Sequence, residues 1–595
     1  MCKISQKIPT LLTHSNITSI FKNKGSRLML ENDRGIFLQP ALKKIMDKLI
    51  YYDLFEDIDR NMSESNIGAR KKRNIRDHLF ILYSVINSVL KDNTDCIDIQ
   101  LYDIQKCFDS LWIDDVFNDL YDILPVSQRN DKISLLYNSC KTNLVSVKTP
   151  GGLSERVDMP CIIQKGGVWG SLLCSNTIDH IGRTCRDTGK NIYLYKNRTE
   201  ILPLGFVDDL SGISKCGLSS LNLNIFFNAQ VELKKLAFHT DSSGSSSKCV
   251  RMHVGKQVHK CLPLKVHNQK MSDVSEITYL GDVICADGRN LQNVHNRTKK
   301  GTGLICQIIK ILHTISFGSH TVEISLLLRN AIFINGMLTN AEVWFDLKKS
   351  EIEQFEKTDR ILLQKIFHMP SSIPAVALYL ELGIMPLSVV IKVRRVLYLH
   401  NILKSKRDGM LHRVFTVQWH YPSKGDWTLQ VKADLESLDL PVDLATIKSF
   451  SKEKFKTIVK SKAKVYTLNL LGSKKTNYRK LERLHYGELQ IQDYLLDNQL
   501  THDDKITILK LRTRMSDFGE NFRAGKEFTV CPVCSSHLDC QSFLLQCPGL
   551  IHEIRTKFGP NHIDSIDEVY AEKISTKTIK TLTYAMDVRK TKLNC

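Results

Sequence analysis

The chain has 595 residues, enough for several domains, and its apolar fraction of 42% is ordinary for a folded globular protein. Its 83 Lys and Arg residues against 63 Asp and Glu residues give a formal net charge of +20, which predicts a polyanionic partner. Nucleic acid is the favoured partner, and an anionic membrane surface is the alternative. The 17 cysteines lack the spacing of a secreted disulfide scaffold, and the sequence has neither a signal-peptide pattern nor an uncharged apolar run of about 18 residues. Composition therefore excludes a disulfide-stapled secreted domain and a membrane-spanning protein, and it predicts reduced thiols in the nucleus or cytoplasm.

The first strong signals along the chain are a buried helix over residues 77–89 and a strand over residues 97–101. In the strand, apolar and polar residues alternate, which predicts that one of its faces is buried. Asp103 falls at the end of this strand, where a carboxylate can reach a metal ion. Asp109 follows an aromatic residue and is predicted to cap the next helix.

Two adjacent acids stand in the middle of a later apolar run. Residues 202–207 predict a strand, and Asp208 and Asp209 follow at the tip of a tight hairpin. Neighbouring carboxylates raise each other's pKa, so the pair is costly unless a cation neutralises it. Together with Asp103, the pair offers the clustered carboxylates that hold two Mg²⁺ ions in phosphoryl transfer. A solvated Asp-Asp turn is the alternative.

The pattern after the acids is mostly helical. Residues 221–236 carry Leu221, Ile225, Ala229, Leu233 and Leu236 at helical spacing, predicting a helix that backs the sheet through these side chains. Residues 241–247 read as a polar loop, and a strand resumes after Lys248. Further buried helices are predicted at 304–315, 324–345 and 389–403.

Residues 448–480 contain eleven Lys or Arg residues and one acid, Glu453. Such a segment suits template binding, and a solvated helical face or a disordered tail are the alternatives.

A cluster of soft metal ligands lies near the C-terminus. Cys531 and Cys534 form a Cys-x-x-Cys pair, and His537, Cys540 and Cys547 follow. This ligand set suits tetrahedral Zn²⁺. We favour His537 over Cys540 as the fourth ligand, beside Cys531, Cys534 and Cys547.

Several of these motifs together resemble the reverse transcriptases of non-LTR (LINE-type) retrotransposons, over residues 17–398. Asp103 with Phe108, and Phe206-Val-Asp-Asp209, are similar to the two acidic motifs of that family's palm. Other segments match in the same order along the chain. Residues 32–37 and 62–73 resemble the family's fingers, and residues 164–173 resemble its Gln-Gly…Pro-Leu segment. Lys248 stands where the family carries a lysine, and Tyr279-Leu280-Gly281 resembles its primer grip.

The sequence departs from the family pattern at three positions. Lys165 separates Gln164 from Gly166, and Ser171 stands where the family has proline. In the family's C-terminal Cys-Cys-His-Cys knuckle a histidine precedes the last cysteine by four residues, and this chain has Phe543 there. A decayed knuckle is therefore the alternative to a zinc site.

The resemblance implies an α+β fold of the right-hand polymerase type, with a palm made of an antiparallel sheet backed by helices. The implied domains are fingers over 1–94, palm over 95–284, helical thumb over 285–405, a basic helical region over 406–524 and a zinc-knuckle-like module with a tail over 525–595. The 48 residues after Cys547 are too few for the family's endonuclease, so either this is a partial element or cutting is supplied in trans.

The resemblance also implies an activity: extension of a primer 3′-hydroxyl on an RNA template by two-metal nucleotidyl transfer. Asp103, Asp208 and Asp209 would bind two Mg²⁺ ions, and Lys248 would protonate the leaving pyrophosphate. The implied nucleotide-binding residues are Phe108, beneath the sugar, Arg70 on the triphosphate, and Gln164 and Gly166.

The implied partners are RNA template, DNA primer or target and deoxynucleoside triphosphates, in a nuclear or cytoplasmic ribonucleoprotein. Three other functions compete: a viral RNA-dependent RNA polymerase, an intron maturase-like splicing cofactor, and a decayed or domesticated copy that only binds RNA. Phe108 and Tyr279-Leu280-Gly281 argue against the viral polymerase.

Overall fold

The computed structural model divides the chain into two compact units, Met1–Arg289 with Ser405–Thr428, and Asn290–Lys404 with Leu429–Cys595. The structure describes residues 8–23, 25–92, 96–124, 131–141, 144–159, 163–240, 248–256, 261–315, 318–406, 409–518, 530–560 and 565–593. The predicted domain boundaries stay predictions, and those near residues 94 and 524, like the predicted loop 241–247, fall outside the described residues.

The first unit is built around a five-stranded sheet in the order β14-β11-β3-β10-β9. Its strands are β3 (Ile97–Asp103), β9 (Leu204–Phe206), β10 (Asp209–Lys215), β11 (Val250–Val254) and β14 (Ser272–Val274). The central strand β3 runs antiparallel to both β10 and β11. It is buried on both faces rather than on the one face that its alternation predicted. A buried polar side chain of β3 is hydrogen-bonded, because the Gln100 amide donates to the carbonyl and hydroxyl oxygens of Ser220 at 2.9 Å.

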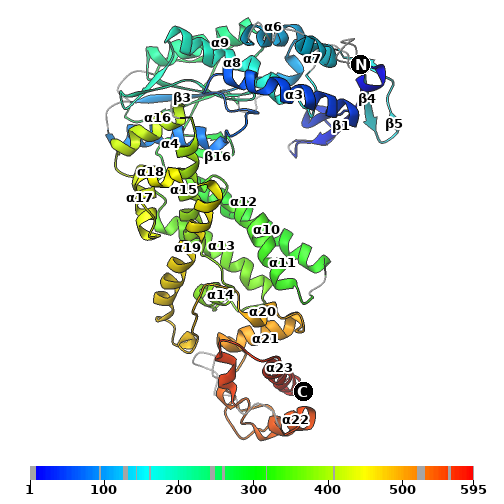
Figure 1. Cartoon of the computed structure of the whole chain (residues 1–595), viewed down its shortest axis with the longest axis vertical. Coiled ribbons are helices and arrows are strands. Elements are labelled where there is room, and N and C mark those ends of the chain that lie inside the picture. The colour runs from blue at the N-terminus through cyan, green and yellow to red at the C-terminus, as the bar shows by residue number, and fades with distance from the viewer. Residues whose placement is uncertain are drawn as a thin grey trace. The chain divides into compact units, whose positions relative to one another are not determined.

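Helices cover the two faces of this sheet (Figure 1). On one side lie α8 (Gly170–Thr188) and α9 (Leu218–Leu233), and on the other α4 (Ile75–Asp92) and α16 (Met410–His420). The helix α4 contains the predicted helix 77–89 and is buried along that span.

The helix α9 confirms the predicted helix but not its predicted buried face. Ile225 and Leu233 are 57% and 68% exposed, whereas Leu223 and Phe227 are buried. The sequence carries two apolar stripes, and β10 selects one: a Cβ at Gly212 would lie 2.7 Å from Leu223 Cδ2 and 2.6 Å from Phe227 Cε2. The absence of a side chain at Gly212 thus lets this stripe approach the strand closely.

A second sheet in this unit has the order β2-β1-β4-β5, with β6 also paired to β4. Its strands are β1 (His14–Phe21), β2 (Asp33–Leu38), β4 (Leu144–Thr149), β5 (Gly152–Leu153) and β6 (Val157–Asp158). Short two-stranded pairs are β7 (Tyr193–Tyr195) with β8 (Thr199–Ile201), β12 (Lys265–Val266) with β13 (Gln269–Lys270), and β15 (Glu276–Tyr279) with β16 (Asp282–Cys285). The remaining helices are α2 (Thr10–Thr13), α3 (Ala41–Asn61), α5 (Cys107–Ser110), α6 (Ile113–Ile123) and α7 (Asp131–Lys141).

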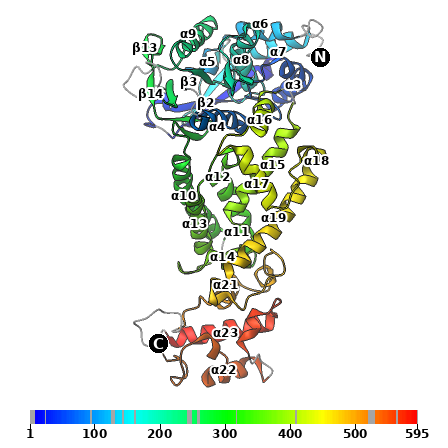
Figure 2. The same ribbon diagram turned by 90° about the vertical axis from the view of Figure 1, so that its left-hand side faces the viewer.

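The second unit is helical in its described part (Figure 2). Its first helices are α10 (Leu291–Thr314), α11 (Thr321–Leu328), α12 (Asn335–Met337), α13 (Lys349–Ile366), α14 (Ala375–Glu381) and α15 (Leu387–Lys404). They are followed by α17 (Trp427–Ser437, which begins in the first unit), α18 (Leu444–Ser449), α19 (Lys452–Lys475), α20 (Asp493–Leu496), α21 (His502–Arg512), α22 (Pro548–Phe558) and α23 (Thr576–Leu593). Within the described residues, no helix is both long and apolar enough to cross a bilayer.

The predicted helix over 324–345 is wrong at its C-terminal end. The helix of α11 continues through a π-helical stretch, Arg329–Ile334, into α12, and it stops at Met337. Asn340 then adopts a left-handed conformation with φ 64°, which ends any α-helical run. The predicted helices at 304–315 and 389–403 are confirmed by α10 and α15.

The basic segment 448–480 contains a long helix, α19, so a disordered tail is excluded there. Phe455, Val459, Ala463, Thr467 and Leu471 form its buried stripe, at intervals of four residues. The N-cap Ser451 hydroxyl accepts from the Lys454 backbone N–H at 3.3 Å. The lysines therefore lie on the remaining faces of an ordered helix.

Candidate active site

Three acids meet at one end of the five-stranded sheet. The hairpin between β9 and β10 turns at Val207 and Asp208, with Val207 at φ 58°, and Asp209 is the first residue of β10. In the ladder between β10 and β3, Asp209 lies directly opposite Asp103. Directly opposed residues on antiparallel strands lie about 5 Å apart and point to the same face. The predicted hairpin thus brings the three acids to one end of the sheet, within electrostatic reach of one another.

The electrostatics of this end of the sheet reflect the crowding of negative charge. Burial, and then the charges of Asp208 and Asp103, raise the pKa of Asp209 from 3.8 to about 6. Burial raises the pKa of Asp208 too, with a further contribution from Asp103. A cation bound between these carboxylates would remove both penalties.

Two lysines supply positive charge to the acids. The Lys248 ammonium donates to Asp103 Oδ2 at 2.8 Å and lowers the pKa of both Asp208 and Asp209. Lys165 lowers the pKa of Asp208 as well. Sequence reasoning treated Lys165 as an interruption of a motif, since a lysine in a loop carries no signal of what it will face.

Asp109 does not cap a helix, contrary to the prediction. It lies inside α5, and α6 begins after Trp112 without a side-chain cap. Asp109 instead accepts from Lys165 at 2.7 Å. The same ammonium lies 5.9 Å from the centroid of the Phe108 ring. The loop lysine therefore ties α5 to the segment that begins at Gln164.

That segment is a tight loop whose glycines are required by close approaches. Gly166 has φ 96°, and a Cβ there would lie 3.2 Å from the Phe37 carbonyl oxygen. A Cβ at Gly170 would lie 2.7 Å from the Gln164 carbonyl oxygen and 3.6 Å from Phe108 Cε1. The loop thus packs between β2 and the Phe108 ring.

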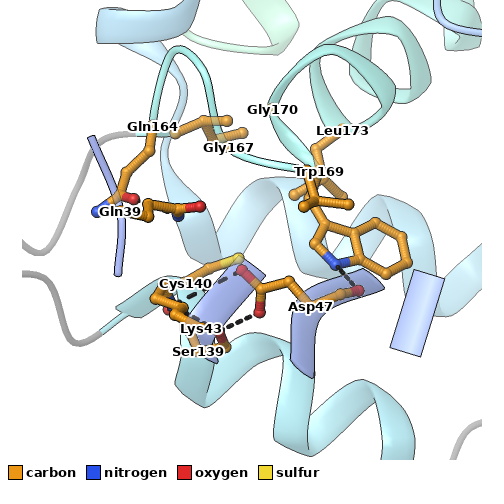
Figure 3. Close-up of a pocket in the computed structure, with 12 residues that line it drawn as sticks. Gln39, Lys43, Asp47, Ser139, Cys140, Gln164, Gly167, Trp169, Gly170 and Leu173 are labelled. Atoms are coloured by element: carbon orange, nitrogen blue, oxygen red, sulfur yellow. Dashed lines mark hydrogen bonds and ion pairs between the residues drawn. The ribbon is translucent and has the colours of Figure 1, made fainter. Parts of the chain in front are cut away.

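Gln164 is 7% exposed and accepts from the Gln39 amide at 2.5 Å (Figure 3). Both side chains line a small cavity beside Lys43, Asp47 and Trp169. Sequence reasoning missed this network, because its members lie far apart in the chain.

The network beneath the loop is fully buried. The Lys43 ammonium donates to the Ser139 carbonyl oxygen at 2.6 Å and to its hydroxyl at 2.7 Å, and this hydroxyl donates to Asp47. The Trp169 indole N–H donates to the Asp47 carbonyl oxygen at 3.1 Å. A satisfied buried network of this kind fixes the loop on α3 and α7.

Arg70 is not free to hold a triphosphate, contrary to the prediction. It is 9% exposed, and its guanidinium donates to the Asp59 carboxylate at 2.6 Å. It also donates to the carbonyl oxygens of Asp59, Ser63 and Asn66 at 2.7, 2.5 and 2.8 Å. Arg70 therefore fastens the segment 62–70. Its neighbours Lys71 and Lys72 are exposed, and the Lys71 ammonium lies 4.7 Å from the centroid of the Phe55 ring.

The segment 62–70, which Arg70 fastens, packs against the hairpin between β9 and β10. The Gly205 backbone N–H donates to the Ser65 carbonyl oxygen, and the Ile67 N–H donates to the Gly205 carbonyl oxygen, both at 3.0 Å. A Cβ at Gly68 would lie 2.5 Å from the Val207 backbone nitrogen. The segment thus backs β9 and the turn that carries Asp208.

The predicted primer-grip residues form the turn between β15 and β16. Leu280 and Gly281 both have positive φ, 47° and 85°, as a two-residue hairpin turn requires. The Tyr279 hydroxyl lies 3.1 Å from Nδ1 of the buried His78, whose Nε2 lies 2.9 Å from the Ser65 carbonyl oxygen. Burial, and then the charge of Asp209, raise the Tyr279 pKa, so this hairpin lies within electrostatic reach of the acids.

In the second unit, the Cys531, Cys534 and Cys547 sulfurs lie within 4.8 Å of one another. The Cys531 and Cys547 sulfurs are 3.7 Å apart, and the Cys534 sulfur is 3.5 Å from His537 Nδ1. Zn–S bonds of about 2.3 Å and Zn–N bonds of about 2.05 Å give tetrahedral edges of about 3.8 and 3.6 Å. The three cysteines named from the sequence therefore fit a zinc ion. His537 lies beside Cys534, but no nitrogen of its ring is within 4.8 Å of all three sulfurs.

The remaining side chains of this region take other positions. The Cys540 sulfur lies 3.2 Å from the Ser542 hydroxyl, and Phe543 packs on the His537 ring with centroids 5.5 Å apart. Burial opposes ionisation of the Cys534 thiol, but hydrogen bonds from Ser536, His537 and Cys547 outweigh it and bring its pKa to about 5. A thiolate at neutral pH is the form that binds metal.

No protein-family model matches the chain, and no curated protein matches it. Solved structures similar to it include truncated apo telomerase from Candida tropicalis, at TM-score 0.32 and 12% identity, covering 47% of this chain and 54% of that one. Another apo telomerase structure from Candida tropicalis has TM-score 0.34 and 11% identity, covering 76% of this chain and 69% of that one.

Telomerase from Candida albicans, in a complex with a fragment of telomeric RNA, has TM-score 0.33 and 12% identity. The match covers 77% of this chain and 66% of that one. The chain thus spans between about half and about two thirds of these telomerases, 54% to 69%. Such low scores leave the chemistry to be argued from the side chains.

Proposed function

We propose that the protein is an RNA-directed DNA polymerase of the retrotransposon type. The observation that carries the proposal is the meeting of Asp103, Asp208 and Asp209 at one end of the sheet, where burial and mutual repulsion raise the pKa of both hairpin acids. Buried like charges on rigid strands are typical of sites that bind a cation or perform catalysis.

The carboxylates supply the oxygen ligands that Mg²⁺ prefers, and two ions would be bound between them. Held there, the ions would activate a primer 3′-hydroxyl and neutralise the phosphates of the incoming nucleotide. The strands β3 and β10 fix the acids before substrate arrives, and preplaced charge is the main source of rate in phosphoryl transfer.

The side chains around the acids suit the roles of the reverse transcriptase palm. Lys248, which donates to Asp103 at 2.8 Å, would protonate the leaving pyrophosphate. Phe108 would lie under the sugar and exclude a 2′-hydroxyl, with Lys165 holding α5 beside it. Gln164 and Gly166 shape the loop against which the nucleotide would rest.

The partners follow from the same proposal: RNA template, DNA primer or target, and deoxynucleoside triphosphates, in a nuclear or cytoplasmic ribonucleoprotein. The basic faces of α19, in a chain of net charge +20, suit a nucleic-acid backbone. A zinc ion on Cys531, Cys534, His537 and Cys547 would fold the C-terminal module, because metal binding and local folding are coupled.

Primer extension on an RNA template with the purified protein and Mg²⁺ tests the activity. The Asp208→Asn and Asp103→Asn variants should lose extension by more than about 10³-fold, because transition-state charge is no longer neutralised. Template binding should survive, because it depends on many distributed lysines and arginines.

Asp187→Asn is the matched control, since Asp187 is an exposed carboxylate on α8 that pairs with Arg186 at 3.0 Å. It should extend primers at the wild-type rate. A wild-type protein that binds RNA but never extends a primer would overturn the proposal and favour an RNA-binding role. Full activity in Asp208→Asn would overturn the assignment of the site.

A further inference from the structure

The far end of the same sheet carries a second group of metal-ligand side chains that the polymerase site does not use. Cys96 immediately precedes β3, Cys216 immediately follows β10, and His253 lies in β11. One ligand atom from each lies within 4.8 Å of the other two. Asp103 lies seven positions after Cys96 along β3, or about 23 Å at strand spacing, so this group is separate from the acids.

The strand register explains why these side chains converge. Asp98 is opposite His253 in the ladder between β3 and β11. The Cys216 backbone N–H donates to the Cys96 carbonyl oxygen at 3.3 Å, which extends the ladder between β3 and β10 by one pair. Residues two apart on one strand, and residues directly opposed on neighbours, share a face of the sheet. Cys96, Asp98, Cys216 and His253 therefore point to one side.

We propose that Cys96, Asp98, Cys216 and His253 form a zinc site that ties together β3, β10 and β11. The Cys216 sulfur lies 3.3 Å from His253 Nδ1 and 3.5 Å from Asp98 Oδ1, and Nδ1 lies 3.1 Å from that oxygen. Zinc bond lengths give tetrahedral edges of about 3.6, 3.5 and 3.3 Å for these three pairs. Small shifts of the side chains would close the site around the ion.

Unsatisfied polar atoms support a ligand at this place. Asp98 is fully buried, and its Oδ2 makes no hydrogen bond within the described part of the chain, although Arg251 lies 3.7 Å away. His253 Nε2 and the Ser214 hydroxyl are buried without a hydrogen bond there too. Such groups cost free energy when they are left unpaired, so the polar atoms of the described residues do not satisfy this part of the sheet.

The charges near the site favour a divalent cation. Two thiolates neutralise a Zn²⁺ ion, and the Asp98 carboxylate lies 3.7 Å from the buried guanidinium of Arg251, which also pairs with Asp273 at 2.6 Å. Cysteine, histidine and carboxylate ligands in a closed tetrahedron suit a structural zinc rather than a hard cation such as Mg²⁺. The ion would fix the register of the strands whose other ends carry Asp103 and Asp209.

Zinc analysis of the full chain, purified without chelator, tests the proposal. The Cys96→Ser/Cys216→Ser double variant should contain one equivalent of zinc less than wild type. The Cys531→Ser/Cys547→Ser double variant isolates the sheet site and should keep one equivalent. Cys185→Ser is the control, because Cys185 is buried in α8 of the same unit but outside the cluster, and its zinc content should equal that of wild type.

Spectroscopy keeps the test decisive if the serine variant folds poorly. In the Cys531→Ser/Cys547→Ser protein, Co²⁺ should give the thiolate charge-transfer and tetrahedral d–d bands, and His253→Asn should weaken Co²⁺ binding by more than about tenfold. A folded Cys531→Ser/Cys547→Ser protein without bound metal would overturn the proposal. So would an unchanged zinc content in Cys96→Ser/Cys216→Ser, or a Cys96–Cys216 disulfide found by mass spectrometry.

Discussion

Neutralising one acid of the hairpin should stabilise the metal-free protein while it abolishes polymerase activity. Asp209→Asn is the clearest perturbation, because the amide matches the carboxylate in shape and removes the charge. In the wild-type protein that charge is buried beside Asp208 and Asp103. We therefore expect the variant to be more stable than wild type in the presence of a chelator.

The magnitude follows from the pKa of Asp209, which is raised from 3.8 to about 6. Each pKa unit corresponds to about 1.4 kcal/mol, so ionising this group costs the folded state about 3 kcal/mol at pH 8. The amide of the variant must itself be hydrogen-bonded in a partly buried place, which reduces the expected gain to about 1–2 kcal/mol. For a unit of this size the gain corresponds to a rise in Tm of about 2–6 °C.

The pH dependence has a definite sign. Because the folded-state pKa is raised, the Asp209 carboxyl favours the folded state fully below pH 3.8, and this contribution is lost as the pH rises through about 6. The ionisation penalty is full at pH 8 and about half as large at pH 5. Because the cost of burying the amide does not change with pH, the net gain from Asp209→Asn should be about 1–2 kcal/mol at pH 8 and close to zero at pH 5.

Thermal unfolding in EDTA at pH 8 and pH 5, with Asp187→Asn as the exposed control, measures these differences. Addition of Mg²⁺ should raise the Tm of wild type but not that of Asp209→Asn, since only the native acid cluster binds the ion well. A variant less stable than wild type at pH 8 in EDTA would refute the reasoning from charge repulsion. An equal gain at both pH values would refute the assignment of that repulsion to Asp209.

Further predictions concern nearby and distant side chains. Phe108→Val should admit ribonucleotides while keeping deoxynucleotide use, measured as the ratio of kcat/KM for the two classes, and an unchanged ratio in an active variant would exclude a steric gate. Asp109→Ala releases Lys165, a half-exposed pair worth about 1 kcal/mol, so extension should fall about fivefold, and a loss as deep as that of Asp103→Asn would contradict this. The buried Arg329 guanidinium donates to both carboxylate oxygens of Asp359, at 2.7 and 2.6 Å. Asp359→Asn removes this bidentate partner and should lower the free energy of unfolding in urea by about 3–5 kcal/mol. A decrease under about 1 kcal/mol would speak against a buried charge pair.

Much of the site could be predicted because its signals are local in sequence. A strand that ends in Asp103, and a hairpin whose tip carries Asp208, follow from short-range patterns of apolar and polar residues. The positive φ of Gly281 likewise follows from a two-residue turn between strands. Such features depend on residues within about ten positions, and the sequence displays them directly.

Tertiary contacts decided what the local patterns left open. An arginine in the sequence can either bind a phosphate or hold a loop in place, and the sequence does not distinguish these roles for Arg70. Only the hydrogen bonds from Arg70 to residues 59–66 show that it holds the loop. The buried stripe of α9 depends on the missing side chain at Gly212, and the partner of Asp109 on a lysine 56 residues away. The group around Cys216 arises from the register of three strands. The sequence by itself therefore determined which residues could do chemistry, and the long-range pairing of strands and loops determined which of them meet.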